Sequence, residues 1–175
     1  LRCLLGLNQV EQPSEDIHDW HSSEVYKSSG VHTTRDEIKK KIFAWLYGGL
    51  EASLGIPAIE SYYNKRQVVN KYWDGNKVTN PFGREIEADE FHALNFLIQS
   101  TTSDLFLRRA IAVNNLLAGR KSRIVALIHD SMLIDLDKED KGILPNLVKT
   151  MEDTELGTFK VNKKVGLTFG ALRSF

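Results

Sequence analysis

The chain has 175 residues and a formal net charge of zero, because 23 lysines and arginines balance 23 aspartates and glutamates. This length suits one domain or a piece of a larger protein, and the zero net charge excludes a strong overall attraction to nucleic acid. The single cysteine excludes an internal disulfide, and no apolar run approaches the ~18 residues of a membrane span. We therefore expect a cytoplasmic protein (in the host cytoplasm if the source is viral) without a membrane partner.

A helix of about 13 residues is predicted over residues 35–48, because two threonines that can cap a helix precede it and a Gly-Gly pair ends it. Arg35, Lys39, Phe43 and Tyr47 are spaced four residues apart, so their side chains form one slowly drifting stripe. The stripe carries two cations, an aromatic ring and a phenol, which is the order that a nucleoside triphosphate needs. The apolar residues predict a separate buried face, formed by Ile38, Ile42, Trp45 and Leu46.

The pattern Arg-x3-Lys-x3-Phe-x3-Tyr-Gly resembles motif B, the O helix in the fingers of family A (Pol I-like) DNA polymerases. The resemblance implies that Arg35 holds the γ-phosphate of a dNTP, and that Lys39 lies near the α-phosphate and donates a proton to the leaving pyrophosphate. It also implies that Phe43 packs against the sugar and that Tyr47 lies where the dNTP meets the template DNA. The competing interpretation is a basic amphipathic helix without this function.

A second match precedes this helix, in a polar stretch that is predicted to be helical to about residue 26. Asp16 and His18 form an Asp-x-His pattern that resembles the one before motif B in the same family, where the histidine approaches the β-phosphate of the dNTP. Histidine suits this role because its ring can donate a hydrogen bond to a phosphate oxygen. The alternative is a surface histidine, with His21 as an equally plausible match.

Residues 58–73 predict another helix, and the Asp-Gly-Asn sequence at 74–76 predicts a tight turn with a short strand on each side. The Gly-Arg pair at 83–84 resembles the Thr-x-x-Gly-Arg hairpin of the family. The interval from Tyr47 to the next motif is shorter than in the bacterial enzymes, which suggests the compact fingers of phage-type members.

A long helix is predicted from Phe91 to about Leu117. Asn95 and Gln99 lie one turn apart on it, where amides can reach the minor-groove acceptors that all four base pairs share. The run around them resembles the phage-type Ala-Leu-Asn-x-Leu-x-Gln-Ser motif, which implies that both residues bind DNA. The alternative is a solvent-facing helix, and Phe91 departs from the family pattern because it stands where an arginine is common.

Residues 123–136 predict two buried strands around a tight turn at His129-Asp130. A carboxylate at the tip of an apolar hairpin is costly unless a divalent cation compensates it, which favours Asp130 as a metal ligand. The segment resembles motif C of the family, usually His-Asp-Glu, with Ser131 in place of the glutamate. The resemblance implies that Asp130 is catalytic through Mg²⁺ and that His129 contacts the primer terminus, whereas a lone His-Asp pair can also be a surface turn.

Beyond this segment we predict a helix over residues 144–151 and a hairpin over residues 159–169. At the other end, Leu1-Arg2 resembles the last two residues of motif A, Asp-x-Ser-x-x-Glu-Leu-Arg, although any buried helix can begin with this pair. The chain opens without an initiator methionine, so we expect a fragment. The resemblance then implies that the first metal-binding Asp and the sugar-selecting Glu precede the chain, and that the chain alone is inactive.

The matches occur in the family's order and predict an α+β fold, a partial polymerase right hand with helical fingers and an antiparallel palm hairpin. The expected parts are the end of the motif A segment (1–12), the fingers (13–82) and the palm (83–175). The resemblance implies template-directed DNA polymerisation from dNTPs with two Mg²⁺ ions, and its partners are primer–template DNA and the missing N-terminal part of the polymerase.

Two alternatives stay open. One is a single-subunit phage-type RNA polymerase, because those enzymes commonly have His-Asp-Ser in motif C, although they usually carry Met at the position of Phe43. The other is a non-catalytic nucleic-acid-binding relic of a polymerase.

Overall fold

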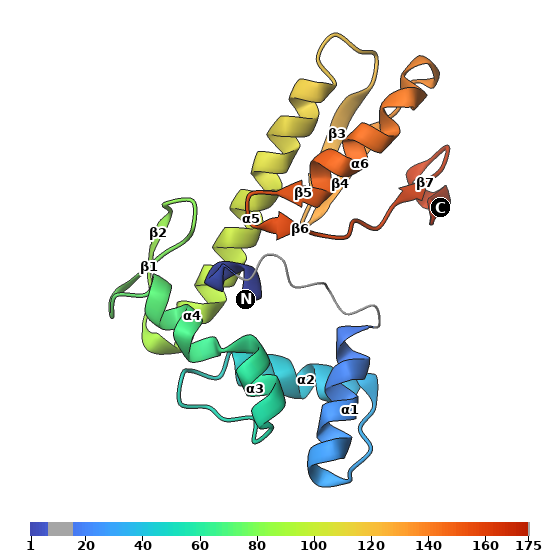
Figure 1. The fold of residues 1–175 in the computed structure, drawn as a ribbon. Coiled ribbons are helices and arrows are strands. Elements are labelled where there is room, and N and C mark those ends of the chain that lie inside the picture. The colour runs from blue at the N-terminus through green and yellow to red at the C-terminus, as the bar shows by residue number, and fades with distance from the viewer. Residues whose placement is uncertain (7–15, 175) are drawn as a thin grey trace. The chain divides into compact units, whose positions relative to one another are not determined.

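The computed structural model describes residues 1–6 and 16–174, and it divides into two compact units, Leu1–Asp104 (unit 1) and Leu105–Phe175 (unit 2). Helices combine with small antiparallel hairpins, which confirms the predicted α+β class (Figure 1). The division between the units falls inside a helix, whereas the predicted border between fingers and palm, at residues 82 and 83, stays a prediction. No helix in the described part of the chain is long and apolar enough to cross a membrane.

The elements of unit 1 are, in chain order, η1 (Arg2–Leu5), α1 (Ile17–Ser29), α2 (Arg35–Leu46), α3 (Pro57–Tyr63), α4 (Lys65–Tyr72), β1 (Lys77–Thr79), β2 (Glu85–Glu87) and the first part of α5 (Glu90–Leu116). The rest of α5 begins unit 2, followed by β3 (Arg123–Ile128), β4 (Ser131–Asp135), η2 (Lys138–Ile143), α6 (Leu144–Glu152), β5 (Asp153–Thr154), β6 (Gly157–Thr158), β7 (Lys164–Val165), η3 (Phe169–Ala171) and β8 (Arg173–Ser174). The strands pair antiparallel as β1–β2, β3–β4, β5–β6 and β7–β8. The predicted motif A segment also covers residues 7–12, which lie outside the described residues.

Helix α2 confirms the predicted helix and shows why it begins and ends there. Thr34 accepts a hydrogen bond from the backbone N–H of Glu37, and the Glu37 carboxylate accepts one from the backbone N–H of Thr34, which forms a capping box. At the other end, a Cβ at Gly48 would lie 2.6 Å from the carbonyl oxygen of Ala44. Any residue other than glycine at position 48 would therefore require the backbone to shift.

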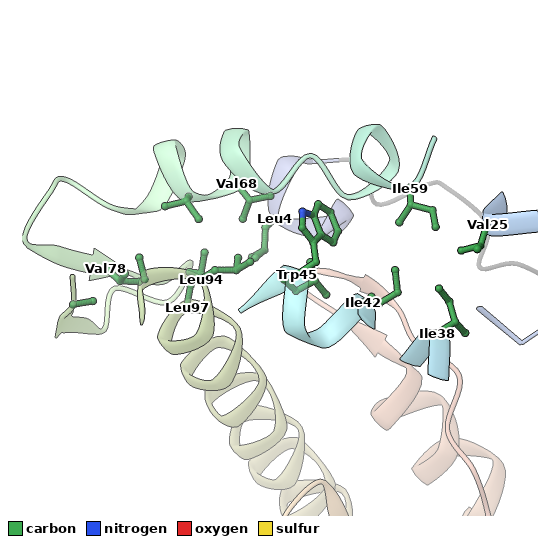
Figure 2. Close-up of a cluster of buried hydrophobic side chains, with 14 residues drawn as sticks. Leu4, Val25, Ile38, Ile42, Trp45, Ile59, Val68, Val78, Leu94 and Leu97 are labelled. Atoms are coloured by element: carbon green, nitrogen blue, oxygen red, sulfur yellow. The ribbon is translucent and has the colours of Figure 1, made fainter. Parts of the chain in front are cut away.

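The core of unit 1 gathers side chains from the helices and from β1 (Figure 2). The predicted apolar face of α2 is buried in it, and Ile38 and Ile42 are among its least exposed residues. Val25 from α1, Ile59 from α3 and Val68 from α4 belong to the same cluster. Burial of one face of α2 leaves Arg35, Lys39 and Phe43 of the predicted stripe exposed, whereas Tyr47 is partly buried against this core.

The single helix predicted over residues 58–73 is wrong, because the structure divides this segment into α3 and α4. Asn64 lies between them with φ 46°, in the left-handed region that asparagine tolerates better than most residues. Its backbone N–H caps α3 by donating to the carbonyl of Glu60 at 2.8 Å. The helical periodicity of the sequence continues through this break and hides it.

The turn at residues 74–76 carries less strand structure than predicted. Trp73 makes only an isolated bridge to Val78, and β1 pairs with β2 instead, with Val78 opposite Ile86. The hairpin between them is held by Asn80, whose buried side chain accepts from two backbone N–H groups of its own turn and donates to Asp104 at 2.7 Å. This polar anchor, which the turn dipeptides do not reveal, decides where the hairpin forms.

Unit 2 packs α5 and α6 with the β3–β4 hairpin around Val113, Leu117, Ile143 and Leu147. The strands β3 and β4 form the predicted hairpin, but the prediction that both are buried is wrong. Val125 and Leu127 are 49% and 43% exposed, because only the opposite face of the hairpin has a hydrophobic partner. The continuous apolar run therefore overstated the burial.

The C-terminal hairpin predicted over residues 159–169 is also wrong in its extent. Strand β7 pairs with β8 across η3, with Val165 opposite Arg173. Gly166 allows this turn, because a Cβ there would lie 2.5 Å from the carbonyl oxygen of Ala171. Helix α6 matches the predicted helix, with its proline in the first turn.

Candidate nucleotide-binding site

Three of the four residues predicted as a stripe, Arg35, Lys39 and Phe43, belong to α2, and Tyr47 is its C-cap. The rings of Phe43 and Tyr47 are stacked, with centroids 6.1 Å apart and planes 9° apart. Lys39 Nζ lies 5.9 Å from the centroid of Phe43, within the range of a cation–π contact. Phe43 is 41% exposed, so its ring can still receive a ligand on this surface.

Helix α1 adds His18 to this stripe. Its ring meets Phe43 edge-on, with centroids 6.2 Å apart. Asp16 caps α1 by accepting from the backbone N–H of His18 at 2.8 Å, and its other oxygen accepts from Arg35 Nη2 at 2.7 Å. All five residues predicted to bind a dNTP therefore form one connected group, which we call the α1–α2 face: His18, Arg35, Lys39, Phe43 and Tyr47.

The charges of this face follow from its contacts. The hydrogen bond from Arg35 lowers the pKa of the Asp16 carboxyl, and the same contact raises the pKa of Arg35. Burial lowers the pKa of His18, and the cations of Arg35 and Lys39 lower it as well, whereas the Asp16 carboxylate raises it. Arg35 is already paired in the absence of a ligand, so an anion that binds it has to compete with Asp16.

Two residues behind His18 escaped the sequence prediction of the site. His21, which the sequence presents only as an equally plausible match in place of His18, is fully buried. Its Nδ1 lies 3.2 Å from Nδ1 of His18, and its Nε2 lies 2.9 Å from the hydroxyl of Tyr63 on α3. The spacing of three residues between the histidines is visible in the sequence, but nothing local points to Tyr63.

A third missed residue holds the end of α2. Lys65 is 5% exposed, and its ammonium donates to the backbone carbonyls of Trp45, Gly49 and Ala52 at 2.9, 2.6 and 3.3 Å. The C-terminal end of a helix leaves such carbonyls without helical partners. Lys65 thereby fixes the backbone on both sides of Tyr47.

The predicted DNA-binding amides lie on α5 as expected from their spacing. Gln99 Nε2 donates to Asn95 Oδ1 at 2.7 Å, so the two side chains share one face. Phe91, at the position where the family often has an arginine, is 57% exposed, and its ring lies 3.3 Å from the place that a Cβ of Gly49 would occupy. The contact of Asn95 and Gln99 with DNA stays a prediction.

In unit 2, His129 and Asp130 form the tip of the β3–β4 hairpin. His129 has φ 54° and both side chains are exposed. An exposed carboxylate has no desolvation cost to compensate, so Asp130 does not require a cation for the stability of the hairpin, contrary to the sequence-based expectation. Within residues 1–6 and 16–174, no three His, Cys, Asp or Glu side chains come together as a metal site.

Comparison with known proteins adds no relative. No protein-family model matches the chain, and no curated protein matches it either.

Proposed function

We propose that the α1–α2 face binds a deoxynucleoside triphosphate, and that the chain is part of a template-directed DNA polymerase of the family A type. The observation that carries the proposal is the edge-on contact of His18 with Phe43. These residues are 25 positions apart in the sequence and lie on different helices. Helical periodicity of α2 alone does not require a histidine to lie against its exposed aromatic stripe.

The chemistry of the face fits this ligand. Arg35 and Lys39 supply fixed positive charge for the phosphates, and His18 adds a donor between them and Phe43. The Phe43 ring offers an apolar surface for the sugar, and Tyr47 continues it toward a base pair. In the proposed reaction the primer 3′-hydroxyl attacks the α-phosphorus and loses its proton to water, the new P–O bond forms, and the P–O bond to the leaving pyrophosphate breaks.

The described residues fit Mg²⁺ only in part. Asp130 can supply one carboxylate, and Mg²⁺ takes one or two carboxylates together with water and substrate phosphates. The other carboxylate of the predicted two-ion arrangement would come from a motif A segment. His129, Asn95 and Gln99 are assigned to primer–template DNA in this proposal.

The proposal is tested by binding of dATP to the purified chain, measured by calorimetry. Arg35→Ala and Lys39→Ala are each expected to weaken binding at least about tenfold, because a hydrogen bond to a charged group contributes about 1.5–3 kcal/mol. Arg66→Ala is the matched control, since Arg66 is an exposed arginine of unit 1 that pairs with Glu51. No binding by the wild type, or an equal loss in the control, would contradict the proposal.

Polymerase chemistry is tested separately by primer extension. The chain alone is expected to be inactive, whereas in a polypeptide that also carries motif A, Asp130→Asn should slow dNTP addition about a thousandfold, equivalent to several kcal/mol of transition-state stabilisation. Asp135→Asn, in the same hairpin and 3.6 Å from Arg123, is the control that should retain activity. Extension by the isolated chain, or full activity of Asp130→Asn, would sink this part of the proposal.

Ser131 after His129-Asp130 keeps the RNA polymerase as a second candidate, because this triplet is common in those enzymes. Calorimetry with ATP and primer extension with rNTPs distinguish an RNA polymerase from a DNA polymerase. Preference for the ribonucleotides would assign the chain to the RNA enzymes.

A further inference from the structure

A chain of hydrogen bonds runs from α3 through α1 to the surface. It connects the Tyr63 hydroxyl to His21 Nε2 at 2.9 Å, and His21 Nδ1 to His18 Nδ1 at 3.2 Å. His21 is fully buried, and Trp20 and Tyr63 have their rings within 5.6 Å of its ring. His18 is the only member of this chain with a ring nitrogen, Nε2, that has no hydrogen-bond partner among the described residues.

The contacts allow two arrangements of protons. In the first, the Tyr63 hydroxyl donates to His21 Nε2, His21 Nδ1–H donates to His18 Nδ1, and His18 carries its proton on Nε2. In the second, all donors are reversed: His18 carries its proton on Nδ1, and the Tyr63 hydroxyl proton has no acceptor among the described residues. In the first arrangement the Tyr63 hydroxyl proton has an acceptor, and the one remaining donor, His18 Nε2–H, lies at the surface end of the chain, so this arrangement is favoured.

The surroundings of the histidines support neutral rings. Burial lowers the pKa of His21 to about 4, and the neighbouring His18 acts in the same direction. Burial lowers the pKa of His18, and the positive charges of Arg35 and Lys39 on α2 lower it further. The carboxylates of Asp16 and Asp19 raise this pKa, but the net effect is a lowering. At neutral pH each ring therefore carries one proton, and the question is which nitrogen carries it.

We propose that Tyr63 and His21 are positioning residues that fix the tautomer of His18, so that His18 presents a neutral Nε2–H donor to a phosphate oxygen. This inference rests on the proposed binding of a nucleoside triphosphate at the α1–α2 face. Phosphate oxygens are acceptors only, so the opposite tautomer would direct a lone pair at the ligand and repel it. His21 and Tyr63 thus decide which ring nitrogen of His18 carries the proton, without touching the ligand.

The first test reads the tautomer directly in the 175-residue chain, without any ligand. Long-range ¹H–¹⁵N correlation spectra of histidine-labelled protein at neutral pH, assigned with His18→Gln and His32→Gln, distinguish protonated from unprotonated ring nitrogens. We expect His21 protonated on Nδ1 and His18 on Nε2. A proton on Nδ1 of His18 in the wild type would overturn the inference.

The second test uses Tyr63→Phe, with Tyr62→Phe as the matched control. Tyr62 is the neighbouring residue in α3 and packs against Trp20, but its hydroxyl takes no part in the chain of hydrogen bonds. Tyr63→Phe should give a mixture of His18 tautomers and weaken dATP binding about threefold, while Tyr62→Phe changes neither. If Tyr63→Phe fails to fold, the wild-type spectrum still decides.

The two proposals fail in different ways. The expected tautomers in a wild type that does not bind dATP would refute the nucleotide site and leave the hydrogen-bond chain standing. Binding of dATP by a protein whose His18 is protonated on Nδ1 would keep the site and refute the role of His21 and Tyr63.

Discussion

Lys65→Met is expected to lower the free energy of unfolding of the chain by about 3 kcal/mol, because the ammonium donates to three backbone carbonyls at the end of α2. A hydrogen bond to a charged group contributes about 1.5–3 kcal/mol, and the cost of burying the ammonium offsets part of the sum. That cost is visible in the pKa of Lys65, which burial lowers. Methionine is apolar and similar in length, so it removes the donor together with the cation–π contact of Lys65 Nζ, which lies 5.0 Å from the centroid of the Trp45 ring.

The measurement is urea unfolding followed by circular dichroism, with Lys40→Met as the control. Lys40 is an exposed lysine of α2, and its loss is expected to change the free energy of unfolding by less than about 0.5 kcal/mol. Equal midpoints for Lys65→Met and the wild type would show that the three carbonyls find other partners. If the expected loss is found, binding of dATP should fall as well, because Tyr47 lies inside the segment that Lys65 holds.

The parts of the fold that the sequence predicts well are those whose cause lies within a few neighbouring residues. Helix α2 is such a case, because Thr34, Glu37 and the following glycines act locally. The long helix α5 and the hairpin at His129 were also predicted close to their observed bounds. For the two helices, periodicity agrees with the tertiary packing, whereas for the hairpin only the turn position and the strand bounds agree.

The parts that the sequence does not predict depend on contacts between distant residues. Asn64 interrupts a periodic helical pattern with one left-handed residue, and the burial of a strand depends on whether another element covers it. At the candidate site the stripe on α2 was predictable from its spacing. The residues that support the stripe from behind were not predictable, because Tyr63 is 42 residues from its partner His21 and Lys65 is 20 residues from its partner Trp45.

Between pH 7 and pH 5, the free energy of unfolding is expected to fall by about 2 kcal/mol through His21 alone. In the unfolded chain His21 binds a proton below its ordinary pKa of 6.5, whereas in the folded chain burial lowers this pKa to about 4. Between these two values the unfolded state holds more protons, so a falling pH favours unfolding. The stability contributed by neutral His21 is complete above pH 6.5 and is lost toward pH 4.

The measurement compares urea unfolding at a series of pH values for the wild type, His21→Gln and His32→Gln. His21→Gln is expected to be less stable at pH 7, since a buried partner of Tyr63 is replaced, but its stability should change much less toward pH 5. His32 is an exposed histidine, so His32→Gln should retain the wild-type pH dependence. If stability changes with pH equally in the wild type and in His21→Gln, His21 is accessible to solvent. A solvent-accessible His21 would also contradict the inference that this ring fixes the tautomer of His18.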